Sequence, residues 1–390
     1  MVKIGLELLE KRLHKRFKNN KAGILVHPAS ISKNFVHAID ILLKSKKIRL
    51  TALFGPQHGI FGQTQDNMIE WEGFIDKRTG LPVYSLYGKV RKPTQEMFNN
   101  IDLMIIDLQD VGSRYYTFIW TMDLCLEACQ EAKKAVIVLD RPNPIRADIT
   151  EGTVLDTKFT SFVGLKPLPI RHGMTIGEIA YYLKNKYYNN LDLQIITMEN
   201  YKRDMWYDET GRHWILPSPN MPTLDTAIVY PGMCLLEGTN ISEGRGTTKP
   251  FEIFGAPFIE PYSFTEELNK LGLEGVYFRP LYFQPIFNKY SGILCGGAQI
   301  HITNRNKFKP FKTGVAIIKI IRNIYHNDFS WRLPPYEYEL TKLPIDILAG
   351  TNKLRRYIDN CKKLEYMEEW WKSECQDFNI NIRKDFLLYR

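Results

Sequence analysis

The sequence is poor in three features that would each indicate a particular class of protein: clustered cysteines, long apolar runs and a phosphate-binding glycine loop. Its six cysteines show no zinc-binding spacing, so we expect reduced thiols in a reducing compartment and no metal site. No apolar run approaches the ~18 residues needed to cross a membrane, and the first residues lack the apolar core of a signal peptide. We therefore expect a cytoplasmic protein without a membrane partner.

The turn after the first expected strand lacks the glycines of a nucleotide-binding loop. Residues 27–30 read His-Pro-Ala-Ser, whereas a pyrophosphate needs small residues at this turn. No dinucleotide cofactor is therefore expected. The Gly-x-Ser-x-Gly motif is also absent from the sequence. A transferase, or an ester or amide hydrolase that uses His58 or His172, is therefore the least supported class of enzyme.

The net charge of +9 does not indicate a nucleic-acid-binding protein. Lysines and arginines are scattered, and their densest runs lie at residues 11–16 and 44–47. The first run is typical of a solvated helix face, and no recognition motif accompanies the charge. We expect no nucleic-acid partner.

Apolar runs that alternate with helical patterns indicate an α/β fold. A chain of 390 residues exceeds the usual size of one core, which predicts two domains. We expect an open, mainly parallel, Rossmann-like sheet, with strands at residues 22–27, 48–54, 103–107 and 135–139. We place this N-terminal domain at residues 1–249 and a second, smaller α+β domain at residues 250–390.

Each of the four expected strands stops in a cluster of polar residues. The clusters are His27; Gln57 and His58; Asp107, Asp110 and Arg114; and Asp140 and Arg141. In open α/β sheets, ligands bind outside the carboxyl ends of the strands, so the four clusters predict one binding rim. The alternative for single members is structural, since Asp140 and Arg141 could form a local ion pair and Asp107 could cap a helix.

Residues 237–250 contain three glycines, two carboxylates, an arginine and a lysine, and no apolar period. Glycines let a backbone approach a ligand closely, so this stretch predicts a substrate-binding loop. The alternative is an ordinary polar connection between two domains. A second polar loop, residues 63–72, contains Trp71, which could either stack on a sugar ring or anchor the loop.

Six motifs occur along the chain in a fixed order. They are residues 54–59 (Phe-Gly-Pro-Gln-His-Gly), 107–112 (Asp-Leu-Gln-Asp-Val-Gly), 139–144 (Leu-Asp-Arg-Pro-Asn-Pro), 171–175 (Arg-His-Gly-Met-Thr), 218–223 (Ser-Pro-Asn-Met-Pro-Thr) and 237–250. Together they resemble the NamZ-like exo-β-N-acetylmuramidases. The resemblance implies a glycoside hydrolase that releases N-acetylmuramic acid, or a related amino sugar, from the non-reducing ends of peptidoglycan fragments. It also implies a small carbohydrate as partner, a site in the cleft between the domains, and no metal or nucleotide cofactor.

One position departs from the resemblance. Many family members carry a glutamate, the expected catalytic acid, where this chain has Gln57, and an amide cannot donate a proton as a carboxylic acid does. Since glycoside hydrolysis ordinarily needs two carboxyl groups, we expect Glu243 beside Arg245 as base or stabiliser. Glu70 and, less usually, His58 are the candidates for the acid. The alternative is a protein that binds carbohydrate without cleaving it.

Muramic acid carries a lactyl carboxylate, which an arginine can hold by two hydrogen bonds. Four arginines are candidates for this role: Arg114, Arg141, Arg171 and Arg245. The amides of Gln109, Asn143 and Asn220 are candidates for sugar hydroxyls or the N-acetyl group. The remaining expected binding residues are Asp66, Asp110, His172 and Thr247. The alternative for about half of the arginines is that they tie the two domains together.

Overall fold

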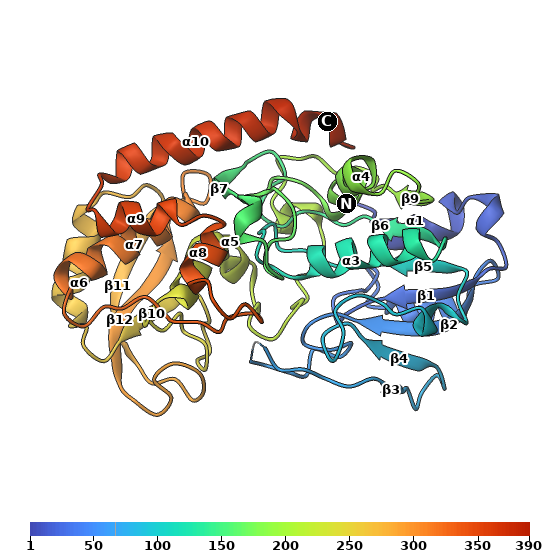
Figure 1. Ribbon diagram of the computed structural model, residues 1–390, viewed down its shortest axis with the longest axis horizontal. Helices are drawn as coiled ribbons and strands as arrows, with labels where there is room; N and C mark the ends of the chain where they lie inside the picture. Colours follow the sequence, from blue (N-terminus) through green and yellow to red (C-terminus); the bar gives the residue numbers. More distant parts are fainter. Residues whose placement is uncertain (67) are drawn as a thin grey trace.

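The computed structural model describes residues 1–66 and 68–390, and the chain forms two halves that lie side by side (Figure 1). One half is built on a seven-stranded sheet and the other on a three-stranded sheet. A helix near the C-terminus runs along both halves, so that the end of the chain returns to the first half (Figure 1).

The large sheet has the strand order β3-β4-β2-β1-β5-β6-β9. Its strands are β1 (Lys21–Leu25), β2 (Arg49–Gly55), β3 (Phe74–Ile75), β4 (Pro82–Ser85), β5 (Leu103–Ile106), β6 (Ala135–Leu139) and β9 (Leu193–Ile196). All neighbouring pairs are parallel except β3 and β4 at the edge. This confirms the Rossmann-like, mainly parallel sheet expected from the sequence.

The second half is an α+β unit, as expected. Its antiparallel sheet has the order β10-β12-β11, formed by β10 (Ile253–Ala256), β11 (Val276–Phe283) and β12 (Cys295–Ile302). A small antiparallel pair, β7 (Glu151–Val154) and β8 (Pro169–Arg171), belongs to neither sheet.

The helices pack against the two sheets and between the halves. The α-helices are α1 (Gly5–Arg12), α2 (Ala38–Leu43), α3 (Phe118–Glu131), α4 (Ile176–Tyr187), α5 (Leu224–Met233), α6 (Pro261–Lys270), α7 (Pro310–Ile324), α8 (Pro344–Ala349), α9 (Lys353–Asp359) and α10 (Leu364–Asn381). The 3-10 helices are η1 (Lys15–Phe17), η2 (Glu96–Phe98), η3 (Thr157–Phe159), η4 (Tyr207–Thr210), η5 (Cys234–Gly238) and η6 (Arg383–Phe386).

Alternation along the central strands gives the large sheet two apolar faces. On β5, Leu103 and Ile105 belong to one core cluster, and Met104 and Ile106 belong to another. Side chains alternate across a strand, and parallel strands that are covered on both faces are apolar throughout. The second cluster continues without a break into the second half, for example to Trp371 on α10. The two halves therefore share one core.

Helix α5 precedes the expected boundary at residue 249, yet it packs against α7 of the second half. A Cβ atom added to Gly232 of α5 would lie 1.9 Å from the carbonyl oxygen of Pro310. The backbones of the two helices can approach this closely only because glycine lacks a side chain.

The polar clusters at the strand ends meet, but largely through contacts with one another. The Arg141 guanidinium donates to both carboxylate oxygens of Asp107, at 2.6 and 2.8 Å. Nε2 of His27 accepts from the Gln109 backbone N–H at 2.9 Å, and its Nδ1–H donates to the Pro217 carbonyl oxygen at 3.0 Å. These groups are buried, so most of the expected rim is an internal network that fixes the strand ends.

We predict that the Asp107→Asn substitution lowers the free energy of unfolding by about 3–5 kcal/mol, because it leaves the buried Arg141 without a counter-charge. Urea denaturation at neutral pH measures the change. The matched control is Asp208→Asn, which removes an exposed partner of Arg305 and should cost no more than about 1 kcal/mol. Equal losses in the two variants would contradict a stabilising role for the buried pair.

Candidate active site

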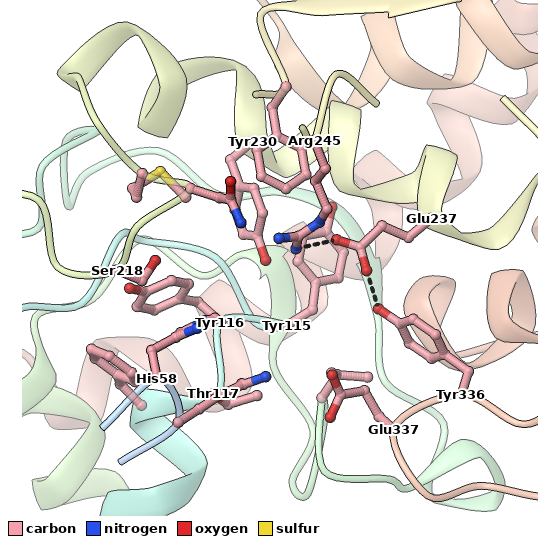
Figure 2. A pocket seen from close by; sticks show the side chains of 16 residues that line it. His58, Tyr115, Tyr116, Thr117, Ser218, Tyr230, Glu237, Arg245, Tyr336 and Glu337 are labelled. Atoms are coloured by element: carbon pink, nitrogen blue, oxygen red, sulfur yellow. Dashed lines mark hydrogen bonds and ion pairs between the residues drawn. The ribbon is translucent and has the colours of Figure 1, made fainter. Parts of the chain in front are cut away.

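A narrow pocket lies between the two halves (Figure 2). Its walls are Gln57, His58, Tyr115, Tyr116, Thr117, Phe118, Val163, Ser218, Asn220, Met221, Tyr230, Glu237, Arg245, Phe251, Tyr336 and Glu337. The centres of water molecules can occupy about 40 Å³ of it, which is room for a few waters. The pocket opens beyond the C-terminal ends of β2 and β5, the edge at which α/β sheets bind ligands.

A buried ion pair forms one wall of the pocket. Nη2 of Arg245 donates to Oε1 of Glu237 at 2.8 Å, and the Tyr336 hydroxyl donates to Oε2 of the same carboxylate at 2.8 Å. Burial raises the pKa of Glu237, but the positive charge and hydrogen bonds of Arg245 and the Tyr336 hydroxyl lower it more, so this pKa ends below its ordinary value. Glu237 is therefore an ionised carboxylate at the pocket.

Arg245 keeps a donor unused on the pocket side. Among the described residues, no group accepts a hydrogen bond from its buried Nη1, and Figure 2 shows the guanidinium between Tyr230 and Glu237. Buried donors without a partner are rare in folded proteins. An anionic or polar ligand group would complete the hydrogen bonding of this arginine.

Glu243 lies behind Arg245 rather than on the pocket wall. Its Oε1 is 3.3 Å from Nε of Arg245, and its Oε2 accepts from Nζ of Lys289 at 3.0 Å. The lysine also donates to the carbonyl oxygens of Leu236 and Ile241. In this geometry Glu243 holds Arg245 in place, and its expected role as base stays a prediction.

A second carboxyl group, Glu337, reaches the pocket from the C-terminal half. It is 5% exposed, and its Oε2 accepts from the Tyr87 hydroxyl at 2.9 Å. Burial raises the pKa of Glu337 to about 7. The pocket thus contains one carboxyl group with a lowered pKa and one with a raised pKa. Glycosidases use such a pair as stabiliser and acid.

Gln57 and His58 contribute the opposite wall. The Thr117 hydroxyl donates to Oε1 of Gln57 at 2.7 Å. Nδ1–H of His58 donates to the Thr64 carbonyl oxygen at 2.6 Å, which leaves Nε2 as an acceptor. Burial lowers the pKa of His58, the hydrogen bond to the Thr64 carbonyl raises it, and the positive charge of Arg245 lowers it; the net result is a pKa of about 4. His58 is consequently neutral at pH 7 and poorly suited to donate a proton.

Part of the pocket wall has a left-handed backbone conformation that only glycine adopts easily. Three of its residues have positive φ angles without being glycine: His58 (70°), Phe251 (64°) and Glu337 (44°). Such conformations cost of order 1–3 kcal/mol each and cluster at functional sites. The strain at these three positions is compatible with a functional role of the pocket.

The structure brings four of the expected site residues to this pocket: Gln57, His58, Asn220 and Arg245. Asn220 is partly committed to the fold, because its amide donates to the Gln65 carbonyl oxygen at 2.6 Å. Thr247 shapes the loop beside Arg245, with its hydroxyl donating to the Gly244 carbonyl oxygen at 2.6 Å.

Arg114 ties the two halves together, which is the alternative considered for the arginines. It donates to the Thr153 and Leu168 carbonyl oxygens at 2.7 and 2.8 Å, and to the Leu348 carbonyl oxygen at 2.8 Å. Arg141 is occupied by Asp107. Arg171 lines a different pocket, beside α10, together with Glu151 and Trp371.

The other side chains expected to bind the sugar form hydrogen bonds within the protein instead. Gln109 donates to the Asp110 and Pro142 carbonyl oxygens, and the Asn143 amide donates to the Met174 carbonyl oxygen. Nε2–H of His172 donates to Oδ2 of Asp110 at 3.0 Å, and neither residue lines the pocket between the halves.

The described part of the second polar loop, residues 63–66 and 68–72, contacts both halves of the chain. Asp66 accepts from the Asn288 amide at 2.8 Å, and Glu70, whose side chain is 48% exposed, pairs with Arg91 at 3.1 Å. Trp71 is buried and donates through Nε1 to the Pro56 carbonyl oxygen, so it anchors the loop. Residue 67 lies outside the described residues.

Sequence reasoning missed Glu337 and did not single out Glu237. Glu237 is the first residue of the stretch 237–250, which the sequence predicts as a substrate-binding loop, so the sequence did point to its position. Glu337 lies in the segment Pro334-Pro335-Tyr336-Glu337-Tyr338, outside every motif, and only its burial against the other half marks it.

Among the described residues, no group of three or more histidine, cysteine or acidic side chains is arranged to hold a metal ion. No helix among them has the length and hydrophobicity to span a membrane.

Comparisons with known proteins agree along the whole chain. Residues 22–225 match the family model of the N-terminal part of the exo-β-N-acetylmuramidase NamZ, and residues 228–389 match that of its C-terminal part. The chain is 44% identical over 388 residues to the peptidoglycan β-N-acetylmuramidase NamZ of Bacillus subtilis, covering 100% of this chain and 91% of the relative.

Two crystal structures of DUF1343 family proteins from Bacteroides fragilis share the fold. They superpose with TM-scores of 0.87 and 0.79, at 32% and 29% sequence identity, and each comparison covers 100% of this chain and 99% of the other.

We predict that His58 stays neutral down to about pH 5. Burial disfavours its charged form, and Nδ1 keeps its proton through the bond to Thr64. NMR titration of the histidine side chains measures this, with the urea-unfolded protein as reference, in which histidines titrate near 6.5. A midpoint for His58 between pH 6 and 7 would overturn the assignment and restore it as a candidate acid.

Proposed function

The chain belongs to the NamZ family of exo-β-N-acetylmuramidases, and we propose that it is a glycoside hydrolase that releases N-acetylmuramic acid, or a closely related amino sugar, from the non-reducing end of peptidoglycan-type fragments. The observation that carries the proposal is the buried pair of Arg245 and Glu237 at the pocket, which offers an ionised carboxylate beside an unused cationic donor. The Glu237 carboxylate can stabilise positive charge at the reacting sugar carbon. The free Nη1 of Arg245 can bind a carboxylate of the sugar.

An exo mode of action is in keeping with the shape of the pocket. The pocket is small and is closed by both halves, so it suits one terminal sugar better than the middle of a chain. Because its water-accessible space is only about 40 Å³, a sugar ring can enter only when the halves or their loops move apart.

The finer substrate assignment rests on the chemistry of muramic acid. Its lactyl ether ends in a carboxylate, and N-acetylglucosamine lacks this group. The unused Nη1 of Arg245 can donate to that carboxylate while Nη2 remains bound to Glu237. A charge-assisted hydrogen bond of this kind contributes about 1.5–3 kcal/mol.

A cytoplasmic role in recycling cell-wall fragments is part of the proposal. The six cysteines are all unpaired, and five of them are buried, which is compatible with a reducing compartment. Fractionation of source cells, with immunodetection of the protein, tests this location. Recovery outside the cytoplasm would overturn it.

The second candidate function is carbohydrate binding without hydrolysis, and Gln57 is the observation that favours it. We predict that the wild-type protein releases N-acetylmuramic acid from its para-nitrophenyl β-glycoside. If the wild type binds this compound without releasing nitrophenol, while the Gln57→Glu variant releases it, the binding function is correct and hydrolysis by the wild type is not.

We predict that Arg245→Lys weakens binding of N-acetylmuramic acid about 10–100-fold and binding of N-acetylglucosamine much less. Lysine keeps the positive charge between Glu237 and Glu243 but loses the second donor of the guanidinium fork. Isothermal titration calorimetry with the two free sugars measures both affinities. Arg305→Lys, at an exposed ion pair, is the control. An equal loss of affinity for both sugars would show that Arg245 does not bind the lactyl carboxylate.

A further inference from the structure

We propose that Glu337 is the general acid of this enzyme and that it supplies the proton which Gln57 cannot. Its buried carboxyl group faces the same pocket as Glu237 and Arg245, and it comes from the half opposite to Gln57. Figure 2 shows this carboxyl group directed into the pocket, below Tyr336 and Glu237 in that view. The inference rests on the glycosidase function proposed above and names the residue that makes it possible.

The hydrogen bonds of Glu337 leave one oxygen for the substrate. The Tyr87 hydroxyl donates to Oε2 at 2.9 Å, and burial beside this carboxyl group raises the pKa of Tyr87 well above its ordinary value, so the phenol stays protonated. Among the residues that the structure describes, none donates to or accepts from Oε1. A proton on Oε1 is therefore the one available to a glycosidic oxygen in the pocket.

The surrounding charges keep this carboxyl group close to its transition between acid and carboxylate. The pKa of Glu337 is raised to about 7, mainly by burial and in part by the negative charge of Glu237. The hydrogen bond from Tyr87 and the charges of Arg245 and Arg91 act in the opposite direction. A general acid works best with a pKa near the working pH.

The segment that carries Glu337 is clamped to the first half of the chain. The Arg91 guanidinium lies 4.2 Å from the ring centroid of Tyr87 and 4.2 Å from that of Tyr338, so it bridges the two halves. Glu337 and Tyr338 have positive φ angles of 44° and 67°. This strained conformation persists because contacts on both sides hold it.

The proton transfer completes a balanced hydrolysis. The bond between the anomeric carbon and the glycosidic oxygen breaks, its electron pair stays on the oxygen, and that oxygen takes the proton from Oε1 of Glu337. Water then bonds to the anomeric carbon and releases one proton, which restores the proton that Glu337 gave up. Glu237 stays ionised beside the anomeric carbon and stabilises its positive charge.

The test compares Glu337→Gln on two substrates that differ only in their leaving group. One is the natural-type disaccharide of N-acetylmuramic acid β-1,4-linked to N-acetylglucosamine, whose sugar alkoxide must be protonated to leave. The other is the para-nitrophenyl glycoside, whose nitrophenolate leaves without a proton. We expect kcat to fall about 10²–10⁴-fold on the disaccharide and about tenfold or less on the aryl glycoside.

The pH profile gives a second readout that a merely structural role would not move. In the wild type, kcat/KM for the disaccharide should fall as pH rises through about 7, because Glu337 loses its proton there. Tyr87→Phe removes a hydrogen bond that favours the carboxylate form, so this fall should move to higher pH. Tyr87 acts as a positioning residue. If Glu337→Gln folds poorly, the pH profile of Tyr87→Phe still tests the role of Glu337.

The matched control is Glu339→Gln, which makes the same change two residues away. The Glu339 carboxylate accepts from Thr341 and Lys342 within its own loop and does not line the pocket, so its activity and pH profile should match the wild type.

The possible results separate this inference from the proposed function. If the wild type releases N-acetylmuramic acid and Glu337→Gln loses activity equally on both substrates, or keeps it on both, Glu337 is not the acid. An unmoved pH profile in Tyr87→Phe would also count against it. If the wild type cleaves neither substrate, the proposed function itself fails.

Discussion

A chain of four alternating charges, three of them on buried residues, organises the pocket between the two halves. Lys289 pairs with Glu243, Glu243 with Arg245, and Arg245 with Glu237. Each charge has a partner of opposite sign, and the sum is zero, so the chain can lie in the interior where an unpaired charge would be very costly. The end of this chain that lines the pocket is the Glu237 carboxylate. Its partners keep it ionised and hold its orientation.

The same chain sets the protonation of the carboxyl group across the pocket. Glu237 needs no proton because Arg245 and Tyr336 satisfy it, and its negative charge helps to keep Glu337 protonated. Tyr336 and Glu337 are neighbours in the chain, so one short segment both binds the ionised carboxylate and supplies the second carboxyl group. Both effects arise within residues 237–337, and the first half completes the pocket with Gln57, His58 and the hydrogen bond from Tyr87 to Glu337. The pocket is consequently a property of the closed arrangement and not of either half alone.

Most polar residues at the carboxyl ends of the strands hold the fold together and do not line the pocket. The clusters lie at the same edge of the sheet, as parallel strands require. However, His27 forms hydrogen bonds with backbone groups, and Asp107 and Arg141 pair with each other. Arg114 likewise ties the halves together. Only the cluster after β2, with Gln57 and His58, keeps its side chains at the pocket. Polar residues in a family motif can thus serve the architecture that holds a site rather than the ligand.

The sequence by itself determined the class of fold, the family and the stretch around Arg245. Apolar alternation and short apolar runs depend on local periodicity, and a helix cap such as Thr175 with Glu178 depends on four adjacent residues. Only the tertiary structure decided which carboxyl groups face each other and in which protonation state. Ionisation depends on burial and on partners distant along the chain, such as Tyr87 and Glu337, which are 250 residues apart. No local pattern contains that information, because folding creates the low-dielectric environment in which Glu237 stays charged and Glu337 holds its proton.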